Sequence, residues 1–480
     1  MYFDLTTFSF ESSARAPDSL AVVGADRELT WAALAEEAHR WADRARVAGL
    51  APDSPVVIRG HKETAFFVAM VGSLMVGAPF VPVDTIYPQA RMDRIVDIVR
   101  PAVVYDAVND TFATPAATGS SEVQKGLAYV LFTSGSTGDP KGVQIGRESV
   151  ALLGHWMTSS FALGDAPVFM NQAPFSFDLS MYEVFGTLSS GGTCVLNARE
   201  AIGTAPWLPR MAERQISVWV STPSFAHQQL VNRQFSASGL PSLKVFLFCG
   251  EPLPRPLALK LRERFPDAVL INTYGTTEAT VATTWVVIDA AMLAGDRPLP
   301  IGRAKPDSEV FVDEGEICIV GDHVMRGYLN RPDLNATRMF VHGNGQRGFR
   351  TGDLGEQAED GLLYCRGRMD DQIKLNGYRI ELSEVDAALG ALSGVSAAAC
   401  AVLRRPDGTP VRLIGFVESA VSTAEPTMTL PDALTDWRAN LALRLPSYMV
   451  PAELVNCPAL PVSGNHKVDR PALLAWYSGL

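Results

Sequence analysis

The segment Leu127–Gly142, LAYVLFTSGSTGDPKG, constrains the fold of this chain more than any other stretch. An apolar, β-favouring run up to Phe132 predicts a buried strand, and Gly142–Ile145 predicts a second one. Between the strands, glycines let backbone N–H groups approach an anion, hydroxyl groups add donors and a lysine adds a positive charge. We therefore predict a phosphate loop made of Thr133, Ser134, Gly135, Ser136, Thr137, Gly138 and Lys141.

Two other interpretations of this loop are weaker. A polar hairpin loop is the ordinary explanation of a turn rich in glycine and serine. The P-loop of nucleoside triphosphatases requires the spacing G-x-x-x-x-G-K-[ST] and a following helix, whereas this loop has another spacing and a predicted strand follows it. The string TSGSTG-x-PKG between two strands is more specific than either alternative, so we retain the phosphate loop.

The net charge and the cysteines exclude several function classes. A formal net charge of -11 over 480 residues argues against nucleic acid or an anionic membrane surface as a partner. The six cysteines are scattered without a C-x-x-C pair, which favours reduced thiols in a cytoplasmic protein over a disulfide framework or a zinc site. The N-terminus has no basic segment leading into an apolar one, so we expect no signal peptide.

One uncharged segment, Ala65–Val83, approaches the length of a transmembrane helix. Pro79 and Pro82 would break such a helix. We therefore predict a buried helix to about Val76, then a strand that ends at Asp84, in a soluble protein.

Helical and strand patterns alternate along the N-terminal part of the chain. Trp31–Ala48 and Arg147–Met157 predict helices, and Pro55–Arg59 and Ala102–Tyr105 predict strands. Polar or glycine turns follow three further predicted strands, which are Ile216–Val220, Val245–Phe248 and Val269–Ile271. Ligands of open α/β sheets bind at such strand ends, so we expect a binding site there.

After Asp370 the pattern changes to that of a small α+β domain. We predict a helix over Ser383–Leu392, a hairpin of Val395–Arg404 and Val411–Val417, and a helix over Pro431–Leu445.

One carboxylate, Asp178, lies in the aromatic and apolar segment Asn171–Phe185. A buried carboxylate is costly unless a cation or several donors face it. Asp178 is therefore either a ligand of a positively charged group or the N-cap of the helix that follows, and this residue alone does not separate the two roles.

Further strings occur in the order typical of one enzyme superfamily. They are FDLS, FCGEPL, NTYGTTEAT, FRTGDL, GRMDDQIKLNGYRIEL and LPVSGNHKVDR. Together with the phosphate loop, these strings resemble the motifs of the adenylate-forming superfamily, which includes acyl-CoA synthetases, luciferases and the adenylation domains of peptide synthetases. The resemblance extends from about Ala65 to Arg470.

Within that superfamily, WVSTPSF, FLFCGE, NTYG-x-TEATVA and QIKLNGYRIEL are similar to the D-alanine–carrier-protein ligases. The sequence departs from that group in three places. Thr276 replaces a proline, His466 replaces a glycine before the last lysine, and Glu309–Glu316 is shorter than the corresponding hairpin. None of these departures removes a charged group of the motifs, so we expect activity.

The resemblance implies a two-domain architecture. Residues 1–369 would form a large N-terminal α/β domain of layered sheets and helices, which binds ATP and an amino acid. Residues 370–480 would form a small, mobile α+β C-terminal lid domain. The same resemblance places a hinge at Asp370, the path of a thiol at Gly377 and the catalytic lysine at Lys467.

The resemblance also assigns ligands to residues. Thr277 would donate to the α-phosphate of ATP, Asp353 would hold the ribose hydroxyls, and Glu278 would bind Mg²⁺. The other residues predicted to bind ATP, beside the phosphate loop, are Gly250, Glu251, Asn272, Thr273, Tyr274, Gly275, Thr276, Arg368 and Lys467. Asp178 would bind the ammonium group of the amino acid. The side chain of that amino acid would contact Leu179, Tyr182, Val220, Leu247, Cys249, Thr273, Val281 and Ala282.

We therefore expect an ATP- and Mg²⁺-dependent ligase that activates a small amino acid, with alanine of either hand favoured, as an aminoacyl-AMP. It would transfer the aminoacyl group to the phosphopantetheine thiol of a separate carrier protein, with no nucleic acid or membrane as partner. Two alternatives stay open. An acyl-CoA ligase for a small carboxylic acid would have no use for Asp178. A non-catalytic adenylate-binding homologue would have lost charged residues, whereas Lys467, Glu278, Asp353 and Arg368 are all present.

Overall fold

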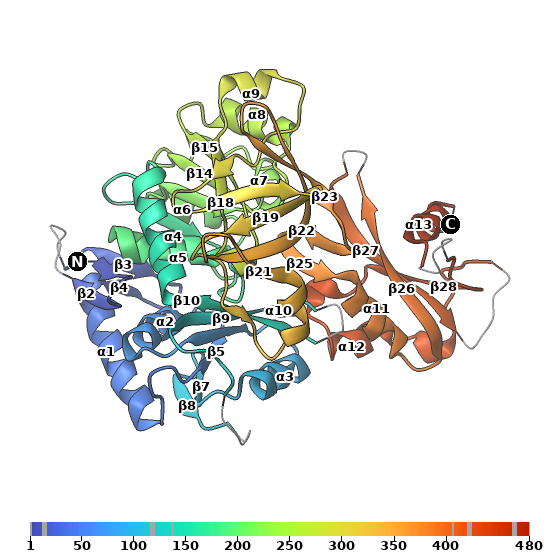
Figure 1. Cartoon of the computed structure of the whole chain (residues 1–480), viewed down its shortest axis with the longest axis horizontal. Coiled ribbons are helices and arrows are strands. Elements are labelled where there is room, and N and C mark those ends of the chain that lie inside the picture. The colour runs from blue at the N-terminus through green and yellow to red at the C-terminus, as the bar shows by residue number, and fades with distance from the viewer. Residues whose placement is uncertain are drawn as a thin grey trace. The chain divides into compact units, whose positions relative to one another are not determined.

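The computed structural model of the chain describes residues 2–11, 17–115, 121–135, 139–405, 408–419, 425–462 and 468–479 (Figure 1). Three residues of the phosphate loop, Ser136, Thr137 and Gly138, lie outside the described residues, as do His466 and the predicted catalytic residue Lys467. No helix in the described ranges combines the length and the apolar character that a membrane crossing needs.

The chain divides into two compact units, each built from more than one segment. The larger unit comprises Met1–Asp84, Ile98–Leu131 and Gly142–Met369. The smaller unit comprises Thr85–Asp97, Phe132–Lys141 and Asp370–Leu480, so the phosphate loop belongs to it. One boundary between the units falls after Met369, next to the residue at which the sequence predicts a hinge.

A nine-stranded sheet organises the larger unit, in the order β17-β16-β15-β14-β13-β11-β12-β3-β4. Its strands are β3 Leu20–Val23, β4 Glu28–Thr30, β11 Val168–Asn171, β12 Thr193–Leu196, β13 Val218–Ser221, β14 Val245–Phe248, β15 Val269–Tyr274, β16 Thr284–Val287 and β17 Arg303–Ala304. The pairs from β15 to β3 are parallel. The three strands predicted before polar turns are therefore confirmed as the neighbours β13, β14 and β15.

Apolar clusters cover both faces of this sheet. Val220 and Leu247 belong to one cluster, and their neighbours Trp219 and Phe246 belong to the other. Because parallel strands are buried on both faces, their sequences are nearly continuous apolar runs. The helices that contribute to the second cluster are α6 Trp207–Glu213, α7 Pro223–Gln229, α8 Arg255–Arg264 and α9 Ala290–Ala294.

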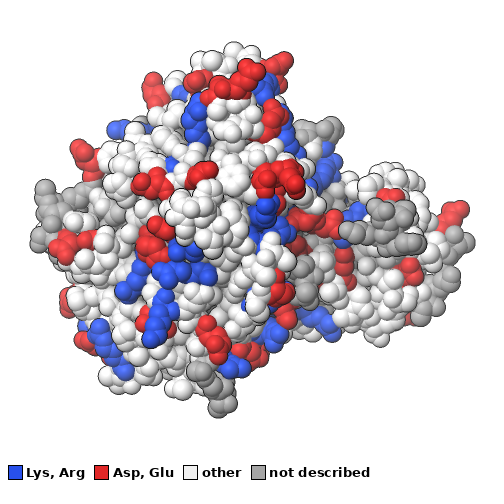
Figure 2. Space-filling model, viewed as in Figure 1, with Lys and Arg blue, Asp and Glu red and all other residues white. Residues whose placement is uncertain are grey.

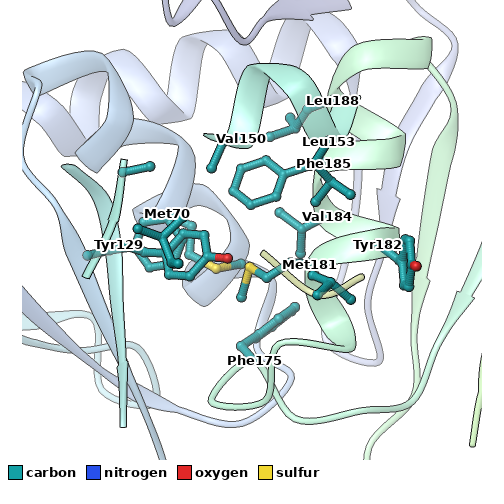
Figure 3. Close-up of a cluster of buried hydrophobic side chains, with 14 of the residues drawn as sticks. Met70, Tyr129, Val150, Leu153, Phe175, Met181, Tyr182, Val184, Phe185 and Leu188 are labelled. Carbon is teal, nitrogen blue, oxygen red and sulfur yellow. The ribbon is translucent and has the colours of Figure 1, made fainter. Parts of the chain in front are cut away.

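The first cluster also contains residues of the helices α2 Thr64–Val76, α4 Arg147–Ser160 and α5 Ser180–Ser190. Figure 3 shows Met70 of α2, Val150 of α4 and Phe185 of α5 directed toward one another. Helix α2 is buried around nearly its whole circumference, which explains its lack of charge. The strand β6 Phe80–Asp84 follows it, so the predicted buried helix and strand are confirmed.

A seven-stranded sheet has the order β20-β10-β9-β6-β5-β7-β8. Its other strands are β5 Val56–Gly60, β7 Val103–Asp106, β8 Thr111–Ala113, β9 Leu127–Thr133, β10 Lys141–Gly146 and β20 Gly327–Tyr328. Strands β9 and β10 are neighbours, so the strand–loop–strand prediction is confirmed. The remaining elements before residue 300 are β1 Tyr2–Asp4, β2 Ser9–Glu11, α1 Trp31–Val47, α3 Gln89–Val99, the 3₁₀ helix Thr277–Ala279 and α9 Ala290–Ala294.

A third sheet consists of β18 Glu309–Asp313, β19 Glu316–Val320, β21 Met339–Val341, β22 Arg347–Gln357 and β23 Leu363–Arg368, with the helix α10 Pro332–Arg338 between β20 and β21. The shortened segment Glu309–Glu316 is the hairpin of β18 and β19. Its two turn residues, Glu314 and Gly315, have φ angles of 48° and 84°, which suit a tight hairpin turn.

The smaller unit contains a hairpin and a three-stranded sheet. Strands β24 Gln372–Leu375 and β25 Tyr378–Glu381 are joined by Asn376 and Gly377, which have φ angles of 51° and 84°. The sheet has the order β26-β27-β28, with β26 Val395–Arg404, β27 Pro410–Ser419 and β28 Glu453–Cys457. The helices of this C-terminal segment are α11 Leu382–Gly390, α12 Trp437–Ala442 and α13 Arg470–Ser478.

The prediction of one continuous helix over Pro431–Leu445 is wrong. A short 3₁₀ turn at Asp432–Leu434 precedes the six-residue helix α12. The hydroxyl of Thr435 donates to the Asp432 carbonyl at 2.9 Å, which is the local hydrogen bonding by which such residues compete with an α-helix.

Basic and acidic side chains are interspersed on the face of the molecule in Figure 2. Ion pairs of the larger unit follow the same pattern, since Glu148 contacts Arg326 at 2.9 Å and Arg347 at 3.1 Å. Neighbouring carboxylates offset the positive charge that a polyanion would need for binding.

Candidate active site

The carboxyl ends of β13, β14 and β15 meet at one edge of the nine-stranded sheet. Ser221 is paired with Phe248, and Phe248 with Asn272, so the segments that follow these residues leave the sheet side by side. These segments carry eleven of the residues that the sequence predicts for binding, which are Cys249, Gly250, Glu251, Thr273, Tyr274, Gly275, Thr276, Thr277, Glu278, Val281 and Ala282. Their convergence follows from parallel pairing, because parallel strands end at the same edge.

Asp178 lies just before helix α5 and faces the segment after β15. The hydroxyl of Thr277 donates to a carboxylate oxygen of Asp178 at 2.8 Å. The N-cap of α5 is Leu179, and no side chain caps this helix. Asp178 is therefore not the N-cap of α5, and this alternative role is wrong.

Buried side chains from one face of the sheet and from α5 belong to one apolar cluster. Val220, Leu247 and Cys249 alternate toward the same face, and all three belong to the first apolar cluster. The hydroxyl of Tyr182 donates to Thr273 at 3.1 Å, and Thr273 donates to the Phe248 carbonyl at 2.8 Å. Burial raises the pKa of Tyr182 well above its ordinary value, which keeps the phenol neutral.

Tyr182 is separated from the aromatic side chains on the other side of its helix. Figure 3 shows the Tyr182 ring on the side of α5 opposite to Tyr129 and Phe185. Leu179, Val281 and Ala282 are also buried, so every residue predicted to contact the amino-acid side chain is buried. The Cys249 thiol lies 3.8 Å from the Val281 carbonyl oxygen. This contact links the end of β14 to the segment after β15.

Gly275 permits the close approach of that segment. A Cβ atom at Gly275 would lie 2.4 Å from the Cα of Ala282, far inside a normal contact. Only glycine therefore fits here. Gly250, at the end of β14, has a φ angle of 93°, another conformation that favours glycine.

Asp353, Arg368 and Tyr274 form a second polar group in the larger unit. The Tyr274 hydroxyl donates to one oxygen of Asp353 at 2.6 Å, and the Arg368 guanidinium donates to the other at 2.6 Å. Burial and the Asp353 charge raise the pKa of Tyr274 well above its ordinary value. Each carboxylate oxygen keeps a further lone pair, so Asp353 can still accept from hydroxyl groups.

Glu278 is fully buried beside this edge of the sheet. The Tyr328 hydroxyl donates to its Oε1 at 2.6 Å, and the Met325 N–H donates to its carbonyl at 2.7 Å. In the described ranges, no three His, Cys, Asp or Glu residues cluster as metal ligands. One carboxylate nonetheless suits Mg²⁺, which commonly binds through one or two carboxylates plus substrate phosphates.

Two predicted ATP-binding residues have partners within the fold. The Asn272 amide donates to the Pro300 carbonyl at 2.7 Å, and Glu251 accepts from the Ser224 N–H at 3.0 Å. Thr276 is buried, and its hydroxyl has no hydrogen-bond partner among the described residues. The roles of these three residues toward ATP stay predictions.

The described part of the phosphate loop contacts carboxylates within the smaller unit. Lys141 donates to Glu381 at 2.9 Å, and the N–H of Gly135 donates to Glu384 at 3.3 Å. Ser134 donates to the Arg379 carbonyl at 3.0 Å. In the described part of the chain the Thr133 hydroxyl is buried without a hydrogen-bond partner. Glu381 and Glu384 were not predicted as contacts of this loop, although Glu381 belongs to the string GYRIEL.

A buried polar group before Asp178 was also not predicted. The Lys62 ammonium donates to Asn171 and to the Ala173 carbonyl, and it lies 4.1 Å from the centre of the Phe175 ring. Burial lowers the pKa of Lys62 to about 8 and raises that of Glu183 to about 8. Lys62 thereby holds the segment that leads to Asp178. Its only sequence signal is a charge just before the apolar segment Ala65–Val83.

Comparisons with known proteins agree with this geometry. The AMP-binding enzyme family matches residues 9–124 and 106–329. A D-alanine–D-alanyl carrier protein ligase of Bacillus licheniformis is 35% identical over 95% of this chain and 96% of its own length. The ligase of the same name from Staphylococcus epidermidis is 37% identical over 95% of each chain. The Vibrio cholerae adenylation domain AlmE, solved with glycyl-adenosine-5'-phosphate, has a TM-score of 0.83 at 21% identity and covers 99% of this chain and 97% of its own.

The fold and the site together define an adenylate-forming enzyme. The chain belongs to the AMP-binding enzyme family. It is an AMP-forming ligase, and the predictions of the superfamily, of the fold class and of a ligase are confirmed.

Proposed function

We propose that this ligase activates D-alanine with ATP and transfers the alanyl group from alanyl-AMP to the phosphopantetheine thiol of a separate carrier protein. The observation that carries this proposal is the Asp178 carboxylate, joined to Thr277 at 2.8 Å beside buried apolar side chains. The names of the relatives at 35% and 37% identity support D-alanine over its mirror image.

The amino-acid site would work by charge and by size. Asp178 would bind the substrate ammonium, because a half-buried carboxylate gains most from a cation. Tyr182, Leu247 and Val281 would leave space for a methyl group and little more, since an overfilled pocket must strain or open. Glycine and serine would remain weaker substrates, because one methyl group is worth only ~1–3 kcal/mol in an apolar pocket.

The ATP site would use residues of several of the predicted motifs. Asp353 would accept the ribose hydroxyls, and Arg368 would fix the Asp353 carboxylate in place. Lys141 and the loop N–H groups would hold the outer phosphates, so the contact of Lys141 with Glu381 would have to open. When bound, Mg²⁺ on Glu278 would neutralise phosphate charge. Thr277 would donate to the α-phosphate, so its hydrogen bond to Asp178 would have to open.

Neither half of the reaction needs a nucleophile from the protein. The substrate carboxylate attacks the α-phosphate, pyrophosphate leaves, and the carrier thiolate then takes the acyl group. The chain must therefore align two anions and stabilise the charge that develops at phosphorus. Lys467 would bridge both anions in the first half. The lid domain, residues 370–480, would turn about Asp370 for the second half, in which Gly377 would line the thiol path.

Asp178 favours this proposal over an acyl-CoA ligase for a plain carboxylic acid, because such a substrate would leave the carboxylate without a cation. A non-catalytic homologue is disfavoured because the charged residues Asp353, Arg368 and Glu278 are present. Arg368 is hydrogen-bonded to Asp353, and Tyr328 is hydrogen-bonded to Glu278. A cytoplasmic location is supported by the six free cysteines, none of which forms a disulfide.

Pyrophosphate exchange with a panel of acids tests the proposal. We expect D-alanine to give the highest kcat/KM, with glycine and serine lower and leucine or glutamate without detectable exchange. Acceptance of a large or charged amino acid, or of acetate in place of alanine, would contradict the assignment of the pocket.

A further inference from the structure

The segment after β15 adopts a backbone conformation that its residues rarely take. Thr280 and Val281 have φ angles of 54° and 70°, so two consecutive β-branched residues lie in the left-handed region. Val281 and the next residue, Ala282, are part of the proposed amino-acid pocket. Such a conformation persists only where surrounding contacts hold it.

Two buried residues outside the predicted site supply these contacts, each through its backbone and its side chain. The Lys305 ammonium donates to the Ala282 carbonyl at 2.8 Å, and the Lys305 N–H donates to the Thr283 carbonyl at 2.8 Å. The His323 carbonyl accepts from the Thr280 hydroxyl at 2.6 Å, and its Nε2 lies 3.0 Å from the Thr283 hydroxyl. Both sides of the left-handed turn are therefore fixed by residues 305 and 323.

Lys305 occupies a position that a neutral side chain would fill at lower cost. It is 3% exposed, its ammonium lies 5.0 Å from the centre of the Trp156 ring, and no carboxylate of the described residues pairs with it. Burial alone lowers its pKa to about 7. A methionine would match the volume without the buried amine. The hydrogen bond to Ala282 is therefore the specific contribution of this lysine.

His323 is fully buried and is suited to the same task. Burial, followed by the nearby Lys305, lowers its pKa well below the ordinary value, so the ring stays neutral. Within the described part of the chain its Nδ1 has no hydrogen-bond partner. The contact of Nε2 with Thr283 is therefore the hydrogen bond that the ring contributes among the described residues.

We propose that Lys305 and His323 are positioning residues that set the shape of the pocket wall at Val281 and Ala282 and thereby the choice of amino acid. Neither side chain needs to touch the substrate, because Lys305 acts through the Ala282 carbonyl and His323 acts through the Thr283 hydroxyl. This inference rests on the proposed amino-acid activation.

Three substitutions test the inference by pyrophosphate exchange. In Lys305→Met we expect the KM for D-alanine to rise about tenfold and the preference for alanine over serine to fall by a similar factor. The KM for ATP should stay within about twofold, because a positioning effect on this wall concerns the amino acid alone. Thr283→Val should act in the same direction, whereas Thr283→Ser, which keeps the hydroxyl, should restore the native values.

Lys260→Met on the exposed face of α8 is the matched control and should behave as the unsubstituted enzyme. If Lys305→Met does not fold, the isosteric Thr283→Val and its serine counterpart decide. Unchanged alanine KM and selectivity in these variants, or an equal rise in both KM values, would overturn the inference alone. Absence of amino-acid-dependent exchange by the unsubstituted enzyme would overturn it together with the proposed function.

Discussion

Three ionisable side chains, the half-buried Asp178 and the buried Lys62 and Lys305, are central to the proposed amino-acid site. Asp178, Lys62 and Lys305 each lie among apolar side chains and are held by a few named partners. Asp178 was predicted because it lies inside a recognisable string. Lys62 and Lys305 were not, since their partners lie about a hundred or about twenty residues away and no local pattern joins them. Sequence motifs show the groups that face substrate more readily than those that support them.

The lowered pKa of the buried Lys305 makes the stability of the protein depend on pH. Its pKa falls from 10.5 in the unfolded chain to about 7 in the folded protein. The unfolded chain therefore binds more protons between these values, and the contribution of Lys305 to the free energy of unfolding rises with pH across that window. We expect the unfolding free energy of the native protein, relative to Lys305→Met, to rise by up to ~1.4 kcal/mol per pH unit.

Urea titrations from about pH 7.5 to about pH 9 measure this difference. His155, Asp307 and His323 line the cavity beside Lys305, and burial, followed by Lys305, holds the pKa of His323 well below its ordinary value, so that ring stays neutral across this window. A difference that stays constant with pH would show that Lys305 does not titrate in this range.

Strands of both units could be predicted from the sequence where an apolar run ends at a polar turn. Strands β14 and β26 have the predicted bounds because their apolar runs end at polar turns. The prediction of one continuous helix over Pro431–Leu445 is wrong because Asp432 and Thr435 form local hydrogen bonds that interrupt the helix. Contacts of the phosphate loop with Glu381 and Glu384 were beyond sequence reasoning, since they join segments about 240 residues apart.

Gly275 tests how closely the segments around the pocket must approach. A methyl group there would meet the backbone of Ala282 at 2.4 Å, so the wall must move. We expect Gly275→Ala to cost about 1–3 kcal/mol of stability and to raise the KM for alanine well above that for ATP. Gly343→Ala, where a Cβ meets nothing within 4 Å, should leave both unchanged. Native kinetics in Gly275→Ala would mean that the pocket wall is assigned wrongly.

At the scale of the whole molecule, the two half-reactions would need different arrangements of the C-terminal lid domain. If Lys467 serves only the first half, Lys467→Ala should abolish alanyl-AMP formation but still transfer the alanyl group from supplied alanyl-AMP to the carrier. The two rates are measured separately by exchange and by the mass gain of the carrier. Equal loss of both halves would refute a change of arrangement between them.

The proposed hinge makes the converse prediction. Asp370→Pro fixes φ at this residue and restricts Met369 before it. We expect alanyl-AMP formation to survive and thioester formation to fall by at least about tenfold, because only the second half needs the rotation. Loss of exchange in a folded Asp370→Pro protein would place the hinge elsewhere.

The recognition of an ammonium group by Asp178 is tested most directly by comparing D-alanine with propionate, which differs only by the amine. Pyrophosphate exchange should favour D-alanine by about 10⁴ in kcat/KM. In Asp178→Asn, which keeps the shape and removes the charge, that ratio should fall by at least about 100-fold. The exposed Asp165→Asn should keep the native ratio. A native ratio in Asp178→Asn would contradict the assignment of this carboxylate as the partner of the substrate amine.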